Sequence, residues 1–198
     1  MTQNLTGRRV AIIVTDGFEQ IELTSPREAL EKAGAKTFVI APKGGEVQGF
    51  KHHDKADRIK VDMTLDKADP SEFDAVLLPG GVINADAIRV EQKAQSFVKE
   101  MDRAGKPIAV ICHGPWLLVS AGLVRDRSIT SWPTLQDDLR NAGARWQDKE
   151  CIRDRNWVSS RKPDDLPVFN EEMTKLLAET QAGKAMRAEN RDSLEVRA

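Results

Sequence analysis

Short apolar runs recur along the chain and alternate with segments of helical pattern. Residues 9–15, 36–41, 75–78 and 108–111 are mainly apolar, which is typical of strands that are buried on both faces of a parallel sheet. A helical segment separates the first two runs. Strand, helix and strand within about 35 residues form a βαβ unit, so the pattern predicts an α/β fold with a mostly parallel sheet.

Capping residues predict where the helices begin and end. Ser25 is the expected N-cap of the first helix, with Pro26 in its first turn and Glu28 completing a capping box, and Gly34 ends it. Residues 151–153 and 157–159 predict a hairpin, and the polar stretch 42–70 predicts an edge strand at 59–62. Further helices are expected at 90–104, 116–121, 134–141 and 166–180.

The domain organisation follows from length and local composition. The 198 residues suffice for one domain of ordinary size. We expect a loose leader at 1–8, a single domain at 9–180 and a charged tail at 181–198. The tail is expected to be helical and solvated, or disordered, and it could also reach a neighbouring subunit.

Charge and cysteine content exclude several functional classes. The chain has 31 acidic and 30 basic side chains and a formal net charge of -1, so nothing supports binding to nucleic acid. Two cysteines do not make a disulfide framework. No apolar stretch approaches the roughly 20 residues that a membrane helix needs. We therefore expect a cytoplasmic protein without a membrane partner.

The strongest chemical signal lies at the end of the fourth apolar run, where Cys112 and His113 precede Gly114 and Pro115. Glycine and proline break the strand, and the next residues can form a helix. Such a strand-to-helix turn exposes a nucleophile to backbone N–H groups and to a helix N-terminus, which lower a thiol pKa. His113 could then act as base or orienting group. The alternative is that Cys112 is a small buried residue at the end of a strand.

Two other loops follow buried strands and are expected at the same edge of the sheet. Glu19 follows the first strand, and Gly80 and Gly81 follow the third. Glu19 could hydrogen-bond or share a proton with the Cys112 thiol. The N–H groups of Gly80, Gly81 and His113 could form an oxyanion hole. Alternatively, Glu19 is a solvated loop carboxylate and the glycines form a plain turn.

The sequence gives weaker evidence for a carboxylate that orients His113, and for a metal site, than for the turn at Cys112. Asp86 follows Gly81 closely and could orient His113, or could be a surface charge at a helix start. His52 and His53 lie in a polar, turn-rich segment, where a surface role is expected. A zinc site needs three or four ligands, and the chain carries no phosphate-loop or dinucleotide fingerprint. The sequence therefore predicts neither a metal nor a cofactor.

Four ordered motifs resemble the PfpI-type intracellular cysteine protease family, which belongs to a wider group that includes the Parkinsonism-associated deglycase. The resemblance implies a flavodoxin-like three-layer sandwich of the class I glutamine amidotransferase-like group. It implies Cys112 as nucleophile, His113 as its partner and Glu19 as the carboxyl that touches the thiol. A carboxylate from an adjacent subunit completes the site in that family, at Asp86 by position, which implies a homo-dimer or higher homo-oligomer. The motifs are residues 16–19, 78–81, 109–115 and 159–167.

Two tryptophans depart from the family pattern. Trp132 stands where some members carry a tyrosine near the cysteine, and the chain has no tyrosine, so a phenolic role is excluded. Trp116 replaces a frequent glutamine, which makes the wall it forms bulkier and less polar. Trp132 and Gly114 complete the expected binding residues.

Three functions use these residues. The first is a stress-response cysteine hydrolase that acts on dicarbonyl adducts, as a deglycase or glyoxalase. The second is an intracellular cysteine peptidase. The third is a redox-sensing or chaperone-like stress protein in which Cys112 is oxidised reversibly.

Overall fold

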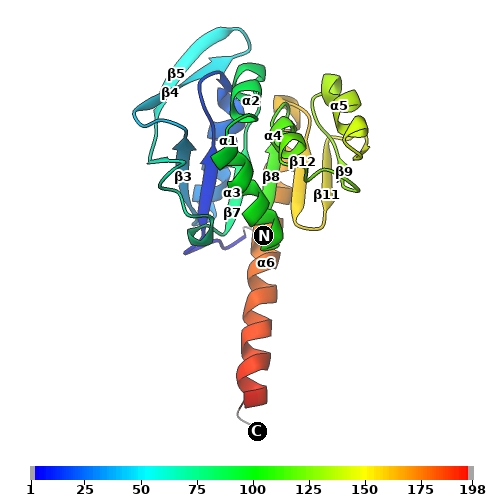
Figure 1. Cartoon of the computed structure of the whole chain (residues 1–198). Coiled ribbons are helices and arrows are strands. Elements are labelled where there is room, and N and C mark those ends of the chain that lie inside the picture. Colours follow the sequence, from blue (N-terminus) through cyan, green and yellow to red (C-terminus); the bar gives the residue numbers. More distant parts are fainter. Residues whose placement is uncertain (1–2, 196–198) are drawn as a thin grey trace.

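The computed structural model describes residues 3–195, with side chains described as far as Thr180. A seven-stranded sheet forms its centre, with the strand order β11-β12-β8-β7-β1-β3-β6 (Figure 1). Neighbouring strands are parallel except for the β11–β12 pair at one edge. The strands are β1 (Arg9–Ile13), β3 (Lys36–Ala41), β6 (Met63–Thr64), β7 (Ala75–Leu78), β8 (Ile108–Ile111), β11 (Cys151–Asp154) and β12 (Trp157–Ser160).

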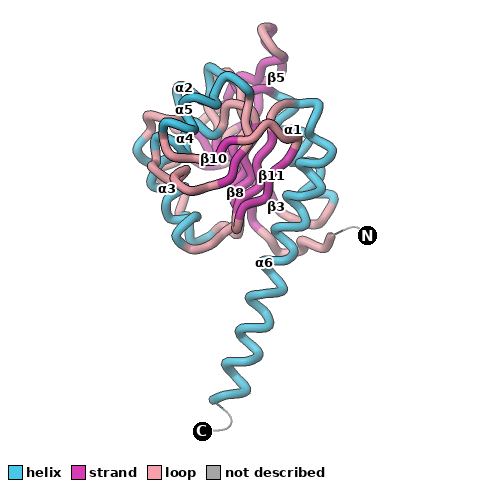
Figure 2. Tube along the Cα trace, turned by 90° about the vertical axis from the view of Figure 1, so that its right-hand side faces the viewer, coloured by secondary structure: helices cyan, strands magenta, loops and turns pink. Residues whose placement is uncertain are grey.

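Helices cover both faces of this sheet (Figures 1 and 2). Alternate residues of β1 show the two layers, because Val10 and Ile12 pack in one buried cluster with α1 and α6, whereas Ala11 and Ile13 pack in another with α3 and α4. The predicted α/β sandwich with a mostly parallel sheet is confirmed. The helices are α1 (Gln20–Lys32), α2 (Val82–Ile88), α3 (Gln92–Arg103), α4 (Pro115–Ser120), α5 (Gln136–Asn141) and α6 (Leu166–Glu195).

The polar segment after β3 forms more strand than its sequence pattern predicts. The strands β4 (Glu46–Lys51) and β5 (Asp54–Lys60) pair as an antiparallel hairpin, and β2 (Phe18–Glu19) joins β4 in parallel. The residues of β5 are mostly exposed. A strand without a buried face shows no clear apolar alternation, so its length could not be predicted.

Short elements complete the chain beside these layers. The strands β9 (Ser128–Ile129) and β10 (Arg145–Trp146) pair with each other in parallel. The predicted hairpin at 151–159 is confirmed as β11 and β12. Single 3-10 turns occur at Pro70–Glu72, Pro133–Leu135 and Pro163–Asp165.

The start of α1 differs from the predicted capping box. The helix begins at Gln20, and Pro26 lies inside it. Glu22 and Leu23, before the expected N-cap at Ser25, are both fully buried. Burial of this first turn against the sheet therefore overrides the local capping preference. The predicted end is confirmed, since Gly34 follows the C-cap with a φ of +98°.

The two ends of the chain are a short segment before β1 and the end of α6, and the predicted leader and tail stay predictions. Leu5 is fully buried, and its N–H donates to the carbonyl of Ala33 at 2.7 Å, so the segment is anchored to the domain at this residue, whereas Asn4, Thr6 and Gly7 are exposed. At the other end α6 continues to Glu195 and extends away from the sheet in Figure 1. Side chains of 181–198, where the charged tail is expected, lie outside the described residues. Within residues 3–195, no helix is both long and apolar enough to span a bilayer.

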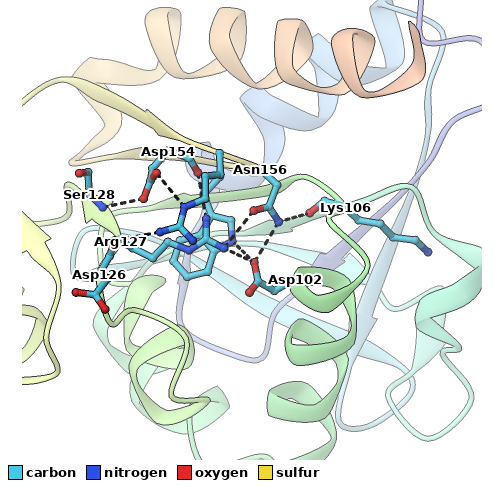
Figure 3. Close-up of polar contacts among 9 residues, drawn as sticks. Asp102, Lys106, Asp126, Arg127, Ser128, Asp154 and Asn156 are labelled. Atoms are coloured by element: carbon cyan, nitrogen blue, oxygen red, sulfur yellow. Dashed lines mark hydrogen bonds and ion pairs between the residues drawn. The ribbon is translucent and has the colours of Figure 1, made fainter. Parts of the chain in front are cut away.

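A polar cluster closes the amino edge of the sheet, at the end of β8 opposite to Cys112 (Figure 3). The Arg127 guanidinium forms an ion pair with Asp102 at 2.6 Å and lies 4.2 Å from the centre of the Trp157 ring. Asp102 also accepts hydrogen bonds from Trp157 Nε1 and Asn156 Nδ2. Asn156 in turn donates to the Lys106 carbonyl at 2.9 Å. Because its donors and acceptors satisfy one another, this cluster serves to join α3, β9, β11 and β12.

Candidate active site

Cys112 lies on a strained turn between β8 and α4. Its φ is +61°, a left-handed conformation that costs a non-glycine residue of the order of 1–3 kcal/mol. Main-chain hydrogen bonds hold the turn in place: the Cys112 N–H donates to the Ser160 carbonyl at 3.1 Å, and the Trp132 N–H donates to the Cys112 carbonyl at 2.9 Å. The thiol-bearing residue is therefore fixed where the sequence predicts a strand-to-helix turn, and it keeps 6% of its surface exposed.

Glycines allow the neighbouring loops to approach this turn closely. A Cβ at Gly80 would lie 2.6 Å from the Cβ of Cys112 and 2.6 Å from Glu22 Oε2. A Cβ at Gly114 would lie 2.6 Å from the Leu78 carbonyl oxygen, between β8 and β7. Real Cβ atoms are not found at such distances. Glycine is thus required at position 80 for this loop to approach Cys112, and at position 114 for the turn to pack against the Leu78 carbonyl.

The carboxyl beside the thiol belongs to Glu22, whereas the sequence analysis assigned that contact to Glu19. Glu22 lies in the first turn of α1, is fully buried and lies beside Cys112 at Gly80, where it interacts with the thiol. Its Oε2 accepts the Gly80 N–H at 2.8 Å, and its Oε1 has no hydrogen-bond partner among the described residues. Burial raises the pKa of Glu22 to about 8, although the Gly80 and Cys112 hydrogen bonds act in the opposite direction. At neutral pH the carboxyl is therefore mainly protonated and can donate to the sulfur.

Glu19 faces a different part of the molecule. Its carboxylate accepts the His52 N–H at 3.0 Å, toward the β4–β5 hairpin. It also lines a cavity of about 380 Å³ with Lys51 and His52, and Cys112 is not among the lining residues. The position at which α1 begins explains why Glu22 and not Glu19 meets the thiol. Glu19 is the N-cap of α1, whereas Glu22 lies three residues later in the first turn and points toward the sheet.

His113 lies between two aromatic rings. Its Nδ1 is 3.1 Å from Cys112 Sγ. The Trp132 ring stacks on the imidazole with centroids 5.8 Å apart, and the edge of Trp116 meets it at 5.4 Å. Burial lowers the pKa of His113 to about 4. The imidazole is therefore neutral at physiological pH and can accept a proton from the thiol.

Asp86 does not contact His113 within the described part of the chain. It lies on α2 with an exposed side chain. The same helix exposes Val82 and Ile83, which are 52% and 55% exposed. A role for Asp86 in orienting His113 would therefore require a second copy of the chain.

Gly80, an expected oxyanion-hole donor, and Gly114, an expected binding residue, have N–H groups that are already engaged. The Gly80 N–H donates to Glu22, and the Gly114 N–H donates to the Ile111 carbonyl at 2.9 Å. The N–H groups of Gly81 and His113 instead hydrogen-bond to Cys112. The pKa of the thiol is nevertheless raised, mainly by burial and further by the charge of Glu22, and these N–H groups offset only part of that increase. The lowered thiol pKa expected from the sequence is therefore not found. Since Glu22 is mainly protonated at neutral pH, the repulsion by its charge is largely absent there.

Sequence reasoning missed Glu22 and the contact of Trp116 with His113. Glu22 falls in the stretch interpreted as a loop, so its direction could not be judged. A helix beginning at Gln20 places Glu22 one turn from the strand end, and that spacing is the signal that could have identified it. Trp116 follows His113 by three residues on α4, which is helical contact spacing.

A thiol on a strand-to-helix turn, with an imidazole and a carboxyl at the carboxyl edge of a mostly parallel sheet, is the arrangement of an α/β cysteine hydrolase. The chain belongs to the DJ-1/PfpI family, which matches residues 8–176. The resemblance drawn from the four motifs is therefore confirmed, and the chain is a hydrolase of this family.

Relatives of known sequence and structure cover most of the chain. Deglycase TK1284 of Thermococcus kodakarensis is 43% identical over 169 residues, which are 85% of this chain and 99% of that protein. Protein/nucleic acid deglycase 2 of Escherichia coli is 39% identical over 171 residues, 86% of this chain and 98% of that protein. A crystal structure from Anabaena variabilis, with DJ-1/ThiJ/PfpI-like and ferritin-like domains, matches with a TM-score of 0.80 and 32% identity, over 86% of this chain and 48% of that chain.

Proposed function

We propose that this protein is a deglycase, in which Cys112 attacks adducts that methylglyoxal and similar dicarbonyls form with amines. The observation that carries the proposal is the contact of the Cys112 sulfur with both His113 Nδ1 and the Glu22 carboxyl. Relatives named deglycases, at 43% and 39% identity over almost their whole length, support the same substrate class.

The chemistry divides among three side chains and two backbone groups. His113 accepts the thiol proton, and the thiolate forms a bond to a carbonyl-derived carbon of the adduct. The N–H groups of Gly81 and His113 stabilise the oxyanion that develops. Cleavage of the carbon–nitrogen bond releases the amine, which takes up a proton, and leaves a hemithioacetal on Cys112. Proton transfer between its two oxygen-bearing carbons, through an enediolate, converts the hemithioacetal into a thioester of lactate. Water then hydrolyses the carbon–sulfur bond, which releases lactate and the free thiol. Overall, a methylglyoxal hemiaminal and one water give the free amine and lactate.

Glu22 supports this chemistry through the sulfur. As a protonated carboxyl it donates a hydrogen bond to the thiolate without adding negative charge, which favours the ionised form. Both cysteines are free thiols, as the reaction requires, and this fits the reducing cytoplasm expected from the sequence.

We further propose that the working form is a homo-oligomer in which Asp86 of a second copy approaches His113. His113 has no carboxylate partner among the described residues of its own chain. Exposed Val82 and Ile83 beside Asp86 provide apolar surface for such a contact. A carboxylate from outside would hold the imidazole in one tautomer.

The test is release of lactate and free amine from methylglyoxal adducts of N-acetyl-arginine and N-acetyl-lysine. We expect turnover by the wild type and none above background by Cys112→Ala. Equal rates for the two proteins would disprove the proposal. Unstructured peptides are tested in parallel, and cleavage of peptides without adduct turnover would identify a peptidase instead.

A second measurement distinguishes a redox sensor from a deglycase. Mild peroxide is added, and sulfenic acid at Cys112 and Cys151 is measured by mass spectrometry. Reversible oxidation of Cys112 without turnover of any adduct would favour the sensor and overturn the deglycase proposal. Turnover that depends on Cys112 supports the deglycase.

A further inference from the structure

Trp116 and Trp132 form the walls of a slot that holds the His113 ring. The position of Trp116 depends on the carboxylate of Asp138, which takes no part in the reaction. The Trp116 indole N–H donates to Asp138 Oδ2 at 2.8 Å. The Arg89 guanidinium carbon lies 5.2 Å from the centre of the Trp116 ring, and Arg89 Nε donates to Ser120 Oγ at 3.0 Å. Asp138 from α5 and Arg89 from the C-cap of α2 thus fix a ring carried by α4.

The opposite wall is fixed in another way. Trp132 is held through its main chain, whose N–H donates to the Cys112 carbonyl at 2.9 Å. Its position therefore follows the nucleophile turn and needs no side-chain partner. The Trp116 main-chain N–H likewise donates to the His113 carbonyl at 3.1 Å, and the Trp116 ring is held in addition by the Asp138 hydrogen bond and the Arg89 contact. Loss of the Asp138 carboxylate would loosen one wall of the slot and leave the other unchanged.

We propose that Asp138 is a positioning residue of the active site, which fixes Trp116 and thereby keeps His113 Nδ1 directed at Cys112 Sγ. The proposal rests on the deglycase function for its activity readout. Among the described residues, the ring contacts with Trp116 and Trp132 and the contact with Cys112 are what hold the imidazole. A small rotation of the imidazole would lengthen the path of the proton from the thiol, and such misplacements lower rates strongly.

Hydration of the slot gives a second consequence. The low pKa of His113 comes from burial, and a mobile Trp116 would admit water to the imidazole and raise that pKa. Two sets of ionisable groups lie near the His113 imidazole. On the side of the sulfur these are Cys112 and Glu22, with Glu19 beyond Glu22. On the side of Trp116 they are Arg89 and Asp138. Asp138→Ala also removes a negative charge, which by itself would lower the pKa of His113. A measured increase in this pKa would therefore mean that hydration outweighs the loss of the charge.

The experiment compares Asp138→Ala with Asp138→Asn and with the matched control Asp137→Ala. Asp137 is the neighbouring exposed carboxylate in the same first helical turn, and its side chain forms no hydrogen bond or ion pair with any described residue. Asparagine keeps an oxygen that can accept the Trp116 N–H. The readouts are kcat and KM for adduct hydrolysis, the pH dependence of Cys112 alkylation by iodoacetamide, and the NMR titration of the His113 ring.

We expect Asp138→Ala to lower kcat about fivefold, the loss typical of one hydrogen bond, with KM changed less than twofold. The His113 pKa should rise, Asp138→Asn should restore both values, and Asp137→Ala should match the wild type. Trp116→Phe, which keeps a ring without the N–H, should reproduce the Asp138→Ala effect, and the double variant should be no worse than either single variant.

Two results would overturn the proposal. One is a wild-type kcat, alkylation profile and His113 titration in Asp138→Ala. The other is an Asp138→Asn variant as impaired as Asp138→Ala. Alkylation and NMR need no turnover, so they test the positioning role separately. If the wild type hydrolyses no adduct but Asp138→Ala still changes both profiles, the deglycase proposal fails and the role of Asp138 stands.

Discussion

Glu22 of α1 and Cys112 of the β8–α4 turn lie beside each other at the carboxyl edge of the sheet and interact electrostatically. Gly80 lies between them, donating its N–H to Glu22 and leaving no room for a side chain beside Cys112. Two groups that ordinarily ionise are therefore buried together. Since two negative charges in contact are costly in such a place, the pair carries at most one of them near neutral pH.

The pH dependence of stability tests the protonation of Glu22. Its pKa is raised from 4.5 to about 8, so between these pH values the folded protein binds a proton that the unfolded chain has lost. Stability from this group is complete below about pH 4.5 and falls as the pH rises toward 8. We expect the wild type to lose about 3–5 kcal/mol over this window relative to Glu22→Gln. Urea unfolding of both proteins from pH 4.5 to 8.5 measures this difference in unfolding free energy. If the free energies of the two proteins changed with pH in parallel, the prediction would be wrong.

Gly80 is predicted to tolerate no larger residue. Gly80→Ala places a methyl group 2.6 Å from both Cys112 Cβ and Glu22 Oε2, so the loop or the nucleophile turn must shift. We expect a loss of about 2–3 kcal/mol in unfolding free energy and a strong loss of adduct hydrolysis. Gly44→Ala is the control, because its nearest contact would be an ordinary 3.7 Å from Thr64 Cγ2. Equal stability and activity of the two variants would show that the close approach at Gly80 is unimportant.

The cluster at the amino edge is predicted to support stability rather than chemistry. Arg127 pairs with Asp102 at 2.6 Å, and the two side chains are 7% and 18% exposed. Arg127→Ala leaves Asp102 without its cation, at a cost of about 3 kcal/mol. Arg58→Ala breaks the exposed pair with Glu46 and should cost less than about 1 kcal/mol. Chemical denaturation provides the comparison, and kcat of the folded Arg127→Ala fraction should equal that of the wild type.

The proposed action of Asp86 in a second copy predicts complementation. Cys112→Ala and Asp86→Asn should each be inactive or strongly impaired as separate oligomers. Mixed after partial denaturation and refolding, they form hetero-oligomers in which an intact Cys112 faces an intact Asp86 from the other chain. We expect about a quarter of wild-type activity from random pairing into dimers. Activity no higher than the mean of the two separate variants would exclude action between chains.

Most of the fold could be predicted because the information is local. The strands β1, β3, β7 and β8 are each a mainly apolar run, and the turn at Cys112 follows from the run that ends there and from Gly114 and Pro115. The hairpin at β11 and β12 was predicted for the same reason. The exposed β5 strand was not, because no buried face imposes a pattern on its side chains.

The site was predictable only in part, since side-chain direction depends on where helices begin. The helix α1 begins at Gln20 and not near the predicted N-cap Ser25. Glu22, and not Glu19, therefore lies beside the thiol. The N–H groups of Gly80 and Gly114 looked available in sequence, but acceptors brought by other segments occupy them.

The sequence by itself determined the parallel sheet, the strained turn and the pairing of Cys112 with His113, because these depend on neighbouring residues and on the rule that parallel strands end at one edge. Tertiary structure decided which carboxyl meets the sulfur, which N–H groups face it, and that Trp116 and Trp132 enclose the imidazole. Those contacts join segments far apart in the chain, and burial in the folded protein then shifts the pKa values of Glu22 and His113.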